Sequence, residues 1–189
     1  MNRVRIIGGQ WRSRQLRFPD APGLRPTPDR VRETLFNWLG QDLTGLTCLD
    51  LFAGSGALGF EAASRGARAV VLVERDRQAA DALRANAAAL QTRAIEVIRA
   101  DALEFLRSRR EGEGPGGYDV AFLDPPYALW QASADVAEVL LSRLAGQLAP
   151  AARVYLEAPV CVEPPPGWQA RKRGRAGAVH YQLLENTVR

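Results

Sequence analysis

The chain contains 189 residues, of which 47% are hydrophobic and 24% charged, and its formal net charge is +4 at pH 7. This length and composition predict one folded domain over residues 1–189 and exclude a disordered or fibrous protein. The sequence has neither an apolar run of about 18 residues that could span a membrane nor an N-terminal signal-peptide core, which predicts a cytoplasmic protein without membrane contact.

The charge is unevenly distributed along the chain. Residues 1–40 hold eight basic and three acidic residues (net +5), residues 41–167 hold 12 and 17 (net −5), and residues 168–189 hold five and one (net +4). Such segregation predicts that the two basic ends hold a polyanion. A solvated charged face is the alternative interpretation of the C-terminal group. The side chains expected to contact the polyanion are Arg12, Arg14, Arg17, Arg171, Lys172, Arg173 and Arg175.

Residues 1–40 are predicted to form a basic arm and a helix. Apolar positions alternate loosely over residues 3–18, which is typical of a short hairpin or an extended arm. Trp11, within the arm, is expected either to stack on a base or to pack the arm onto the core. The helix is expected to begin with Thr27 as its capping residue and to end at Gly40, with apolar residues at helical spacing at Val31, Leu35, Trp38 and Leu39.

Residues 41–189 are predicted to form the catalytic core, because short apolar strands alternate with helices there. The expected strands are 47–52, 69–73, 95–98, 120–123, 153–156 and 179–184, and the expected helices are 57–65, 77–90, 102–110 and 133–144, with a flexible loop at 112–117. This alternation predicts an α/β fold with a doubly wound, Rossmann-like sheet. The sheet is expected to be mostly parallel, with an antiparallel C-terminal strand.

A glycine-rich loop follows the first core strand. Gly54, Gly56 and Gly59 form the pattern Gly-x-Gly-x-x-Gly, which lets the backbone pass close to a ligand at the carboxyl end of the strand. Glu74 closes the next strand, 20 residues beyond Gly54, where a carboxylate accepts hydrogen bonds from two ribose hydroxyls. These features fit NAD as well as S-adenosylmethionine.

Two further acids favour S-adenosylmethionine. Asp50 lies inside the first loop, where it would repel a pyrophosphate but attract a sulfonium and an ammonium group. Asp101 closes the third strand, where it or the backbone of Ala102 can hydrogen-bond an adenine amino group. The alternative is that these acids only cap the helices that follow. The two cysteines fit no metal-ligand spacing, and sulfonium chemistry needs no metal, so none is expected.

The tetrapeptide Asp124-Pro125-Pro126-Tyr127 follows the fourth strand. An exocyclic base amine is a weak nucleophile, because its lone pair is delocalised into the ring. A carboxylate at Asp124 and the Pro125 carbonyl can accept hydrogen bonds from that amine, and the prolines hold both acceptors in place. Tyr127 offers a face on which a base can stack. The alternative is a simple Pro-Pro turn. In this position the motif predicts methyl transfer to a base amine.

The chain resembles the RsmD family over nearly its whole length. The resemblance is carried by Arg5-Ile6-Ile7-Gly8-Gly9, Trp11-Arg12, Leu16, Arg25-Pro26-Thr27, Arg32-Glu33-Thr34-Leu35-Phe36-Asn37, the glycine loop and Asp124–Tyr127. It implies methylation of N2 of a guanine in small-subunit (16S) rRNA, of the guanine(966)-N(2) type, on bare RNA or on a ribosomal particle. The residues it assigns to the cofactor are Asp50, Phe52, Gly54, Ser55, Gly56, Glu74, Arg75, Asp101 and Ala102, and those it assigns to the guanine are Asp124, Pro125, Pro126 and Tyr127.

Three other functions compete with this interpretation. An adenine-N6 DNA methyltransferase uses the same tetrapeptide, but nothing outside the core is large enough to read a DNA sequence. An NAD-dependent oxidoreductase is disfavoured by Asp50 and by the lack of a convincing acid or base for hydride transfer. A catalytically inactive RNA-binding module is disfavoured by the intact tetrapeptide.

Overall fold

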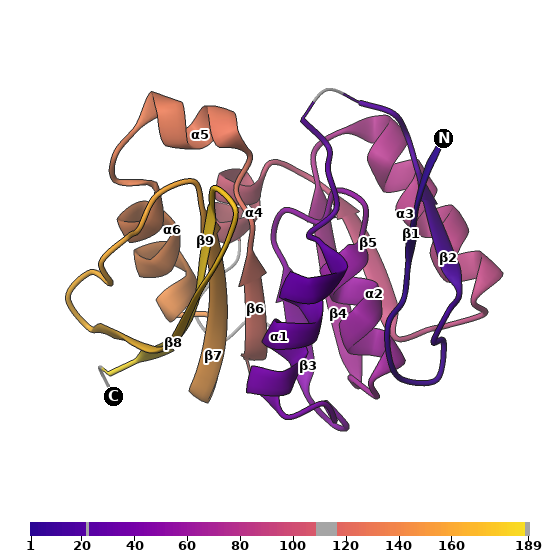
Figure 1. Cartoon of the computed structure of the whole chain (residues 1–189), viewed down its shortest axis with the longest axis horizontal. Helices are drawn as coiled ribbons and strands as arrows, with labels where there is room; N and C mark the ends of the chain where they lie inside the picture. Colours follow the sequence, from indigo (N-terminus) through magenta and orange to yellow (C-terminus); the bar gives the residue numbers. More distant parts are fainter. Residues whose placement is uncertain (22, 109–116, 188–189) are drawn as a thin grey trace.

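The computed structural model describes residues 1–21, 23–108 and 117–187, which form one large sheet, a separate hairpin and the helices around them (Figure 1). In chain order the elements are β1 (Asn2–Arg5), β2 (Gln15–Phe18), α1 (Asp29–Leu39), β3 (Thr47–Asp50), α2 (Ala57–Ser64), β4 (Ala69–Glu74), α3 (Arg77–Ala89), β5 (Ile95–Arg99), α4 (Ala102–Ser108), β6 (Tyr118–Leu123), α5 (Tyr127–Ala132), α6 (Val136–Ala145), β7 (Leu148–Ala158), β8 (Trp168–Ala176) and β9 (Val179–Asn186).

The central sheet has seven strands in the order β5-β4-β3-β6-β7-β9-β8. Neighbouring strands from β5 to β7 are parallel, whereas β9 is antiparallel to both β7 and β8. The predicted doubly wound sheet with an antiparallel C-terminal strand is therefore confirmed. The strand order reverses between β3 and β6, so the carboxyl ends of these strands border a crevice where ligands bind in folds of this kind.

Two layers of helices cover the sheet. One face packs against α1, α2, α3 and the β1–β2 hairpin around a continuous apolar cluster that includes Leu16, Phe36 and Phe122. The other face packs against α4 and α6 around a second cluster. The helical spacing of apolar residues in 29–39 is explained by this packing, because Val31, Leu35 and Leu39 are all buried in the first cluster. No helix in the described residues is long and apolar enough to cross a membrane.

A buried ionic network fixes the N-terminal arm to the core. Glu61 of α2, which is fully buried, accepts hydrogen bonds from the backbone N–H groups of Ile7 (2.8 Å) and Gly8 (2.7 Å). The same carboxylate pairs with the buried guanidinium groups of Arg32 (3.3 Å) and Arg65 (2.8 Å). Arg32 also donates to the carbonyl of Arg5 (2.9 Å). The N-terminal arm is thus a hairpin that is held against helices α1 and α2.

Trp11 packs against the apolar cluster of this face, and its backbone N–H donates to Ser64 Oγ (2.9 Å). Of the two roles open to Trp11 in the sequence, the structure therefore shows the packing role.

Three local predictions differ from the structure. Thr27 does not cap α1, because Pro28 occupies the capping position and the Thr27 carbonyl instead accepts from Arg32 Nε (3.0 Å). The helix expected near 133–144 is α6, and α5, which precedes it, was not predicted. Strand β8 was not predicted either. The loop expected at 112–117 lies outside the described residues, except for Gly117.

Candidate functional site

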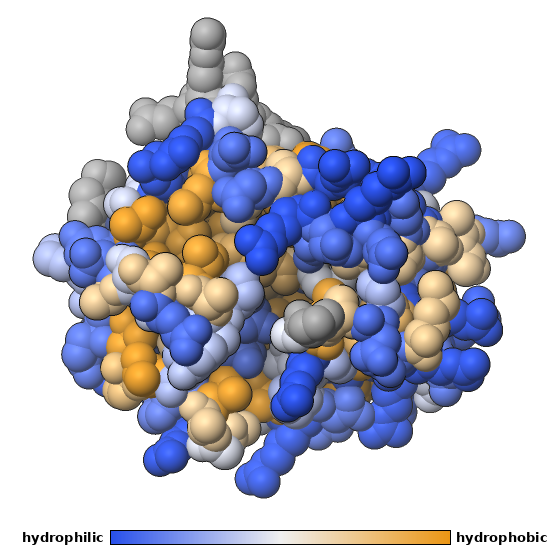
Figure 2. All heavy atoms as spheres, turned by 90° about the horizontal axis from the view of Figure 1, so that it is seen from above, coloured by the Kyte–Doolittle hydropathy of each residue, from blue (hydrophilic) through white to orange (hydrophobic). Residues whose placement is uncertain are grey.

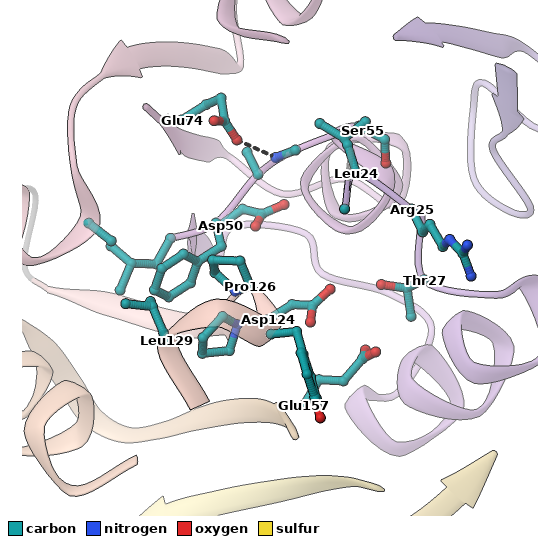
Figure 3. Close-up of a pocket in the computed structure, with 18 of the residues that line it drawn as sticks. Leu24, Arg25, Thr27, Asp50, Ser55, Glu74, Asp124, Pro126, Leu129 and Glu157 are labelled. Carbon is teal, nitrogen blue, oxygen red and sulfur yellow. Dashed lines mark hydrogen bonds between the residues drawn. The ribbon is translucent and has the colours of Figure 1, made fainter. Parts of the chain in front are cut away.

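A cavity of about 880 Å³ opens at the carboxyl ends of β3, β4, β6 and β7 (Figure 3). In the view from above, this edge of the molecule is hollowed, with apolar side chains inside and hydrophilic ones around the rim (Figure 2). The predicted site residues that line it are Asp50, Phe52, Gly54, Ser55, Glu74, Arg75, Asp101, Ala102, Asp124, Pro125, Pro126 and Tyr127. Of the predicted site residues, Gly56 alone is absent from the lining.

Gly56 has a conformational role beneath the cavity. It precedes α2 with φ +78°, and a Cβ added there would lie 2.6 Å from both Leu83 and Phe60. A Cβ added at Gly59 would lie 2.2 Å from Leu72 and 3.2 Å from Asp50 Oδ2. These two glycines therefore allow α2 to pack tightly against the sheet, which brings the loop above it to the cavity wall.

Asp50 lies at the end of β3 and is almost completely buried. Its Oδ2 accepts from the backbone N–H of Gly59 (3.0 Å). Burial raises the pKa of Asp50 to about 7, and the negative charge of Glu74 acts in the same direction, whereas the hydrogen bond from Gly59 opposes the shift. A cation in the cavity would favour the ionised form of this carboxyl group.

Glu74 connects the first two loops of the site. One carboxylate oxygen accepts from the N–H of Gly54 (2.8 Å, dashed in Figure 3), and the other accepts from the N–H of Asp76 (2.7 Å). The side chain is thereby held at the cavity wall beside the glycine loop. The sequence predicted that Glu74 accepts hydrogen bonds from ribose hydroxyls.

Asp101 has the helix-capping contacts of the alternative interpretation. Its Oδ1 accepts from the N–H groups of Leu103 (2.9 Å) and Glu104 (3.2 Å) at the start of α4. The residue also lines the cavity. Capping and ligand contact are thus compatible here, because they can use different atoms of the same residue.

Asp124 directly follows β6 and lines the cavity close to another acid, Glu157. Burial and the charges of Glu157 and Asp50 raise the pKa of Asp124 well above the usual range. Pro126 precedes α5, and Tyr127 begins that helix with 62% of its surface exposed. The tetrapeptide therefore combines a half-buried carboxyl group with an exposed aromatic face at the cavity mouth.

Two parts of this site were not predicted from the sequence. Glu157 at the carboxyl end of β7 lines the cavity and is 9% exposed. Its signal was an acid at the end of an apolar strand, as at Glu74. The segment 23–27 also lines the cavity, and in Figure 3 Thr27 lies beside the carboxylates of Asp124 and Glu157, with Arg25 farther out. Only the resemblance at residues 25–27 pointed to this segment.

The lining fits the adenosyl sulfonium predicted from sequence. Carboxyl groups of Asp50, Glu74, Asp101 and Asp124 surround a space with apolar walls, which suits a cationic ligand that carries an aromatic base and hydroxyl groups. Within the described ranges, no cluster of three or more histidine, cysteine, aspartate or glutamate side chains is arranged to hold a metal ion.

The two basic ends differ in how their charges are paired. On β8, Arg171 pairs with Glu185 (2.7 Å) and Arg173 with Glu163 (2.7 Å). Among the residues described, the exposed side chains of Arg12, Arg14 and Arg17 have no ion pair. Neutral partners are present in the arm, as Arg3 donates to Gln15 (3.1 Å). The arm therefore offers more uncompensated positive charge than β8 does.

Comparisons with known proteins agree with this geometry. A family model described as "Conserved hypothetical protein 95" matches residues 4–185. The chain is 41% identical over 187 residues to "Ribosomal RNA small subunit methyltransferase D" of Escherichia coli strain K12, covering 96% of this chain and 89% of the relative. The solved structure of a candidate methyltransferase of Escherichia coli, yhhF, is 37% identical, with a TM-score of 0.83 and 98% of each chain covered. The rRNA methyltransferase aviRa of Streptomyces viridochromogenes is 19% identical, with a TM-score of 0.66 and 89% and 88% covered, a likeness of fold alone.

Proposed function

This chain belongs to the RsmD family, and on that premise we propose that it transfers a methyl group from S-adenosylmethionine to N2 of a guanine in small-subunit rRNA. We assign the reaction to the guanine(966)-N(2) type. The observation that carries the proposal is that Asp124 shares one cavity with Asp50 and Glu74. A site for the adenosyl group and a site for a base amine are therefore contiguous. Residues 1–189 would act as one methyltransferase domain in the cytoplasm.

Each part of the cavity would have its own role in the reaction. The bound cofactor supplies an electrophilic methyl group. Glu74 accepts from the ribose hydroxyls, and Asp50 compensates the positive charge. Asp124 and the Pro125 carbonyl accept hydrogen bonds from the guanine amine and direct its lone pair toward the cofactor. Tyr127 provides a stacking face for the flipped base. The proton leaves N2 for Asp124 or for solvent.

Nucleoside analysis tests the chemistry directly. Small-subunit ribosomal particles from a strain that lacks the native modification are incubated with the protein and S-adenosylmethionine, and the rRNA is digested for mass spectrometry. We expect N2-methylguanosine, since the proposed site holds an exocyclic purine amine in line with the methyl donor. N6-methyladenosine in the digest, or transfer to DNA in preference to rRNA, would contradict the proposal. Naked 16S rRNA in a parallel reaction shows whether the particle is required.

We further propose that RNA phosphates contact the outer face of the β1–β2 hairpin. Arg3 and Arg17 are cross-strand neighbours on this exposed face. They lie at the end of the hairpin from which the chain continues into the segment that reaches the cavity, whereas the turn with Arg12 and Arg14 lies at the other end (Figure 1). The remaining predicted contacts, on β8, are partly neutralised by Glu163 and Glu185.

Salt dependence distinguishes these surfaces. Changing Arg3 and Arg17 together to glutamine should weaken RNA binding and reduce the slope of log K against log salt by about 0.7–0.9 for each phosphate that is no longer neutralised. The matched control changes Arg171 and Arg173 to glutamine, which removes two arginines that already face acids. Cofactor affinity should stay unchanged in both variants, because neither pair lines the cavity. Equal effects of the two double substitutions on RNA binding would contradict the preference for the arm.

A further inference from the structure

Glu157 is a buried acid of the cavity that the proposed function does not yet use. It is the last residue but one of β7, the strand next to β6, and β6 ends at Leu123, immediately before Asp124. The carboxyl groups of Glu157 and Asp124 lie near one another in the cavity, on the side of Thr27 (Figure 3). Their proximity is also visible in electrostatics, since the charge of Glu157 raises the pKa of Asp124.

The orientation of Glu157 is fixed by the strand that carries it. The fully buried Tyr155 donates its hydroxyl to Glu157 Oε2 at 2.9 Å. The Tyr155 ring packs against Tyr181 of β9, with ring centroids 6.3 Å apart. A buried carboxyl group held by one donor keeps capacity for further hydrogen bonds, because a carboxylate accepts about four.

Guanine offers a complementary pattern of donors. Its N2 amine and its N1–H are attached to the same carbon atom, C2, so they point in adjacent directions along the Watson–Crick edge. Adenine has the same arrangement at C6, where N6 is a donor but N1 is an acceptor. Once Asp124 accepts from the reacting amine, a neighbouring acceptor therefore meets N1–H in guanine and a lone pair in adenine.

We infer that Glu157 reads N1–H of the target guanine through a hydrogen bond and so selects guanine against purines whose N1 is an acceptor. This inference rests on the proposed guanine-N2 activity. Tyr155 is the positioning residue for Glu157. The acceptor beside Asp124 gives specificity in two ways, since it bonds the correct base and repels the N1 lone pair of the wrong one.

A base analogue isolates this contact. 2-Aminopurine keeps the 2-amino group but has an acceptor at N1, and it also lacks O6. Small-subunit particles are reconstituted with rRNA that has guanine or 2-aminopurine at the methylated position, and kcat/KM is measured for both. The wild-type protein should strongly prefer guanine. Glu157→Gln should reduce that preference about 10-fold or more, the range for a hydrogen bond to a charged group, because the amide can donate to the N1 lone pair. The absence of O6 from 2-aminopurine should affect the wild-type protein and Glu157→Gln equally.

Two further variants make the result decisive. Tyr155→Phe should reduce the preference less than Glu157→Gln does, because it frees the Glu157 carboxylate without removing it. Glu138→Gln, an exposed acid on α6 outside the cavity lining, should leave the preference unchanged. Thermal melting and cofactor binding confirm that each variant is folded. If Glu157→Gln does not fold, Tyr155→Phe decides the matter by the same ratio.

The pH profile gives an independent readout. Asp50 and Asp124 line the same cavity as Glu157, the charges of Glu157 and Asp50 both raise the pKa of Asp124, and Tyr155 donates to Glu157 from its own strand. Both Asp124 and Glu157 have raised pKa values, so acceptance of two guanine N–H groups requires proton loss as the pH rises. Glu157→Gln removes one charge that raises the pKa of Asp124. The acidic limb of kcat/KM should therefore move to lower pH.

The outcomes separate the two proposals. If the wild-type protein forms no N2-methylguanosine, the proposed function fails. If it does, but Glu157→Gln retains the wild-type preference for guanine and an unmoved acidic limb, the assignment to Glu157 is overturned while the proposed function stands.

Discussion

Asp124→Ala should strongly reduce methyl transfer while leaving the cofactor bound. Asp124 provides an acceptor for the amine within a buried cavity, and loss of one such preorganised group costs about 100- to 1,000-fold in kcat. The side chain lies at the end of β6, whereas Glu74, the proposed partner of the ribose, lies at the end of β4. Affinity for S-adenosylmethionine, measured by calorimetry, should therefore stay near the wild-type value.

Glu74→Ala is the matched contrast, because it removes a carboxylate from the same cavity. It should weaken cofactor binding by roughly 1.5–3 kcal/mol, the range for hydrogen bonds to a charged group. It also removes the acceptor for the N–H of Gly54. At saturating cofactor its kcat should fall much less than that of Asp124→Ala. Turnover of Asp124→Ala at the wild-type rate would show that the catalytic assignment is wrong.

Glu61→Gln should cause the largest loss of stability. Glu61 is fully buried between Arg32 and Arg65, and its two oxygens also accept from the backbone of the arm. Removal of its charge leaves two guanidinium groups in the interior without their shared partner. Breaking a buried ionic pair in this way costs about 3–5 kcal/mol. Urea-induced unfolding monitored by circular dichroism measures the difference.

Asp81→Asn is the control for Glu61→Gln. Asp81 pairs with Arg77 and Arg84 on the exposed side of α3, where ion pairs contribute less than about 1 kcal/mol. A similar small effect of both substitutions would mean that the arm is held by its apolar contacts and not by the buried network.

The sequence predicted the sheet well because its signals are local. The strands that became β3, β4 and β6 are apolar on both faces, and turn residues separate them from the helices. Strand β8 was missed for the opposite reason. It is an edge strand of mostly polar residues, none of them buried, so its sequence lacks an apolar pattern. Only its hydrogen-bonded pairing with β9 identifies it as a strand. Thr27 has the residue type of a helix cap, but tertiary contacts with Arg32 and the cavity determine its place.

The candidate site shows the same division. The glycine loop and the Asp124 tetrapeptide are each one continuous run of residues, so the sequence could predict both of them. Glu74 and Asp101 were predicted from their positions at the ends of strands. The arrangement of Glu157 and Tyr155 depends on the adjacency of β6 and β7, which pattern alone did not reveal. The ion pairs of Arg171 and Arg173 were not predicted either, because their partners Glu163 and Glu185 lie outside the basic cluster at residues 171–175.

The position of β9 between β7 and β8 has a consequence for synthesis on the ribosome. β8 forms all its ladder contacts with β9, which follows it in the chain. Until residues 179–186 have been translated, β7 has an open edge and β8 has no strand to pair with. The ring of Tyr181, against which Tyr155 packs, is also missing until then. A nascent chain thus completes its cofactor loops early and the support behind Glu157 late.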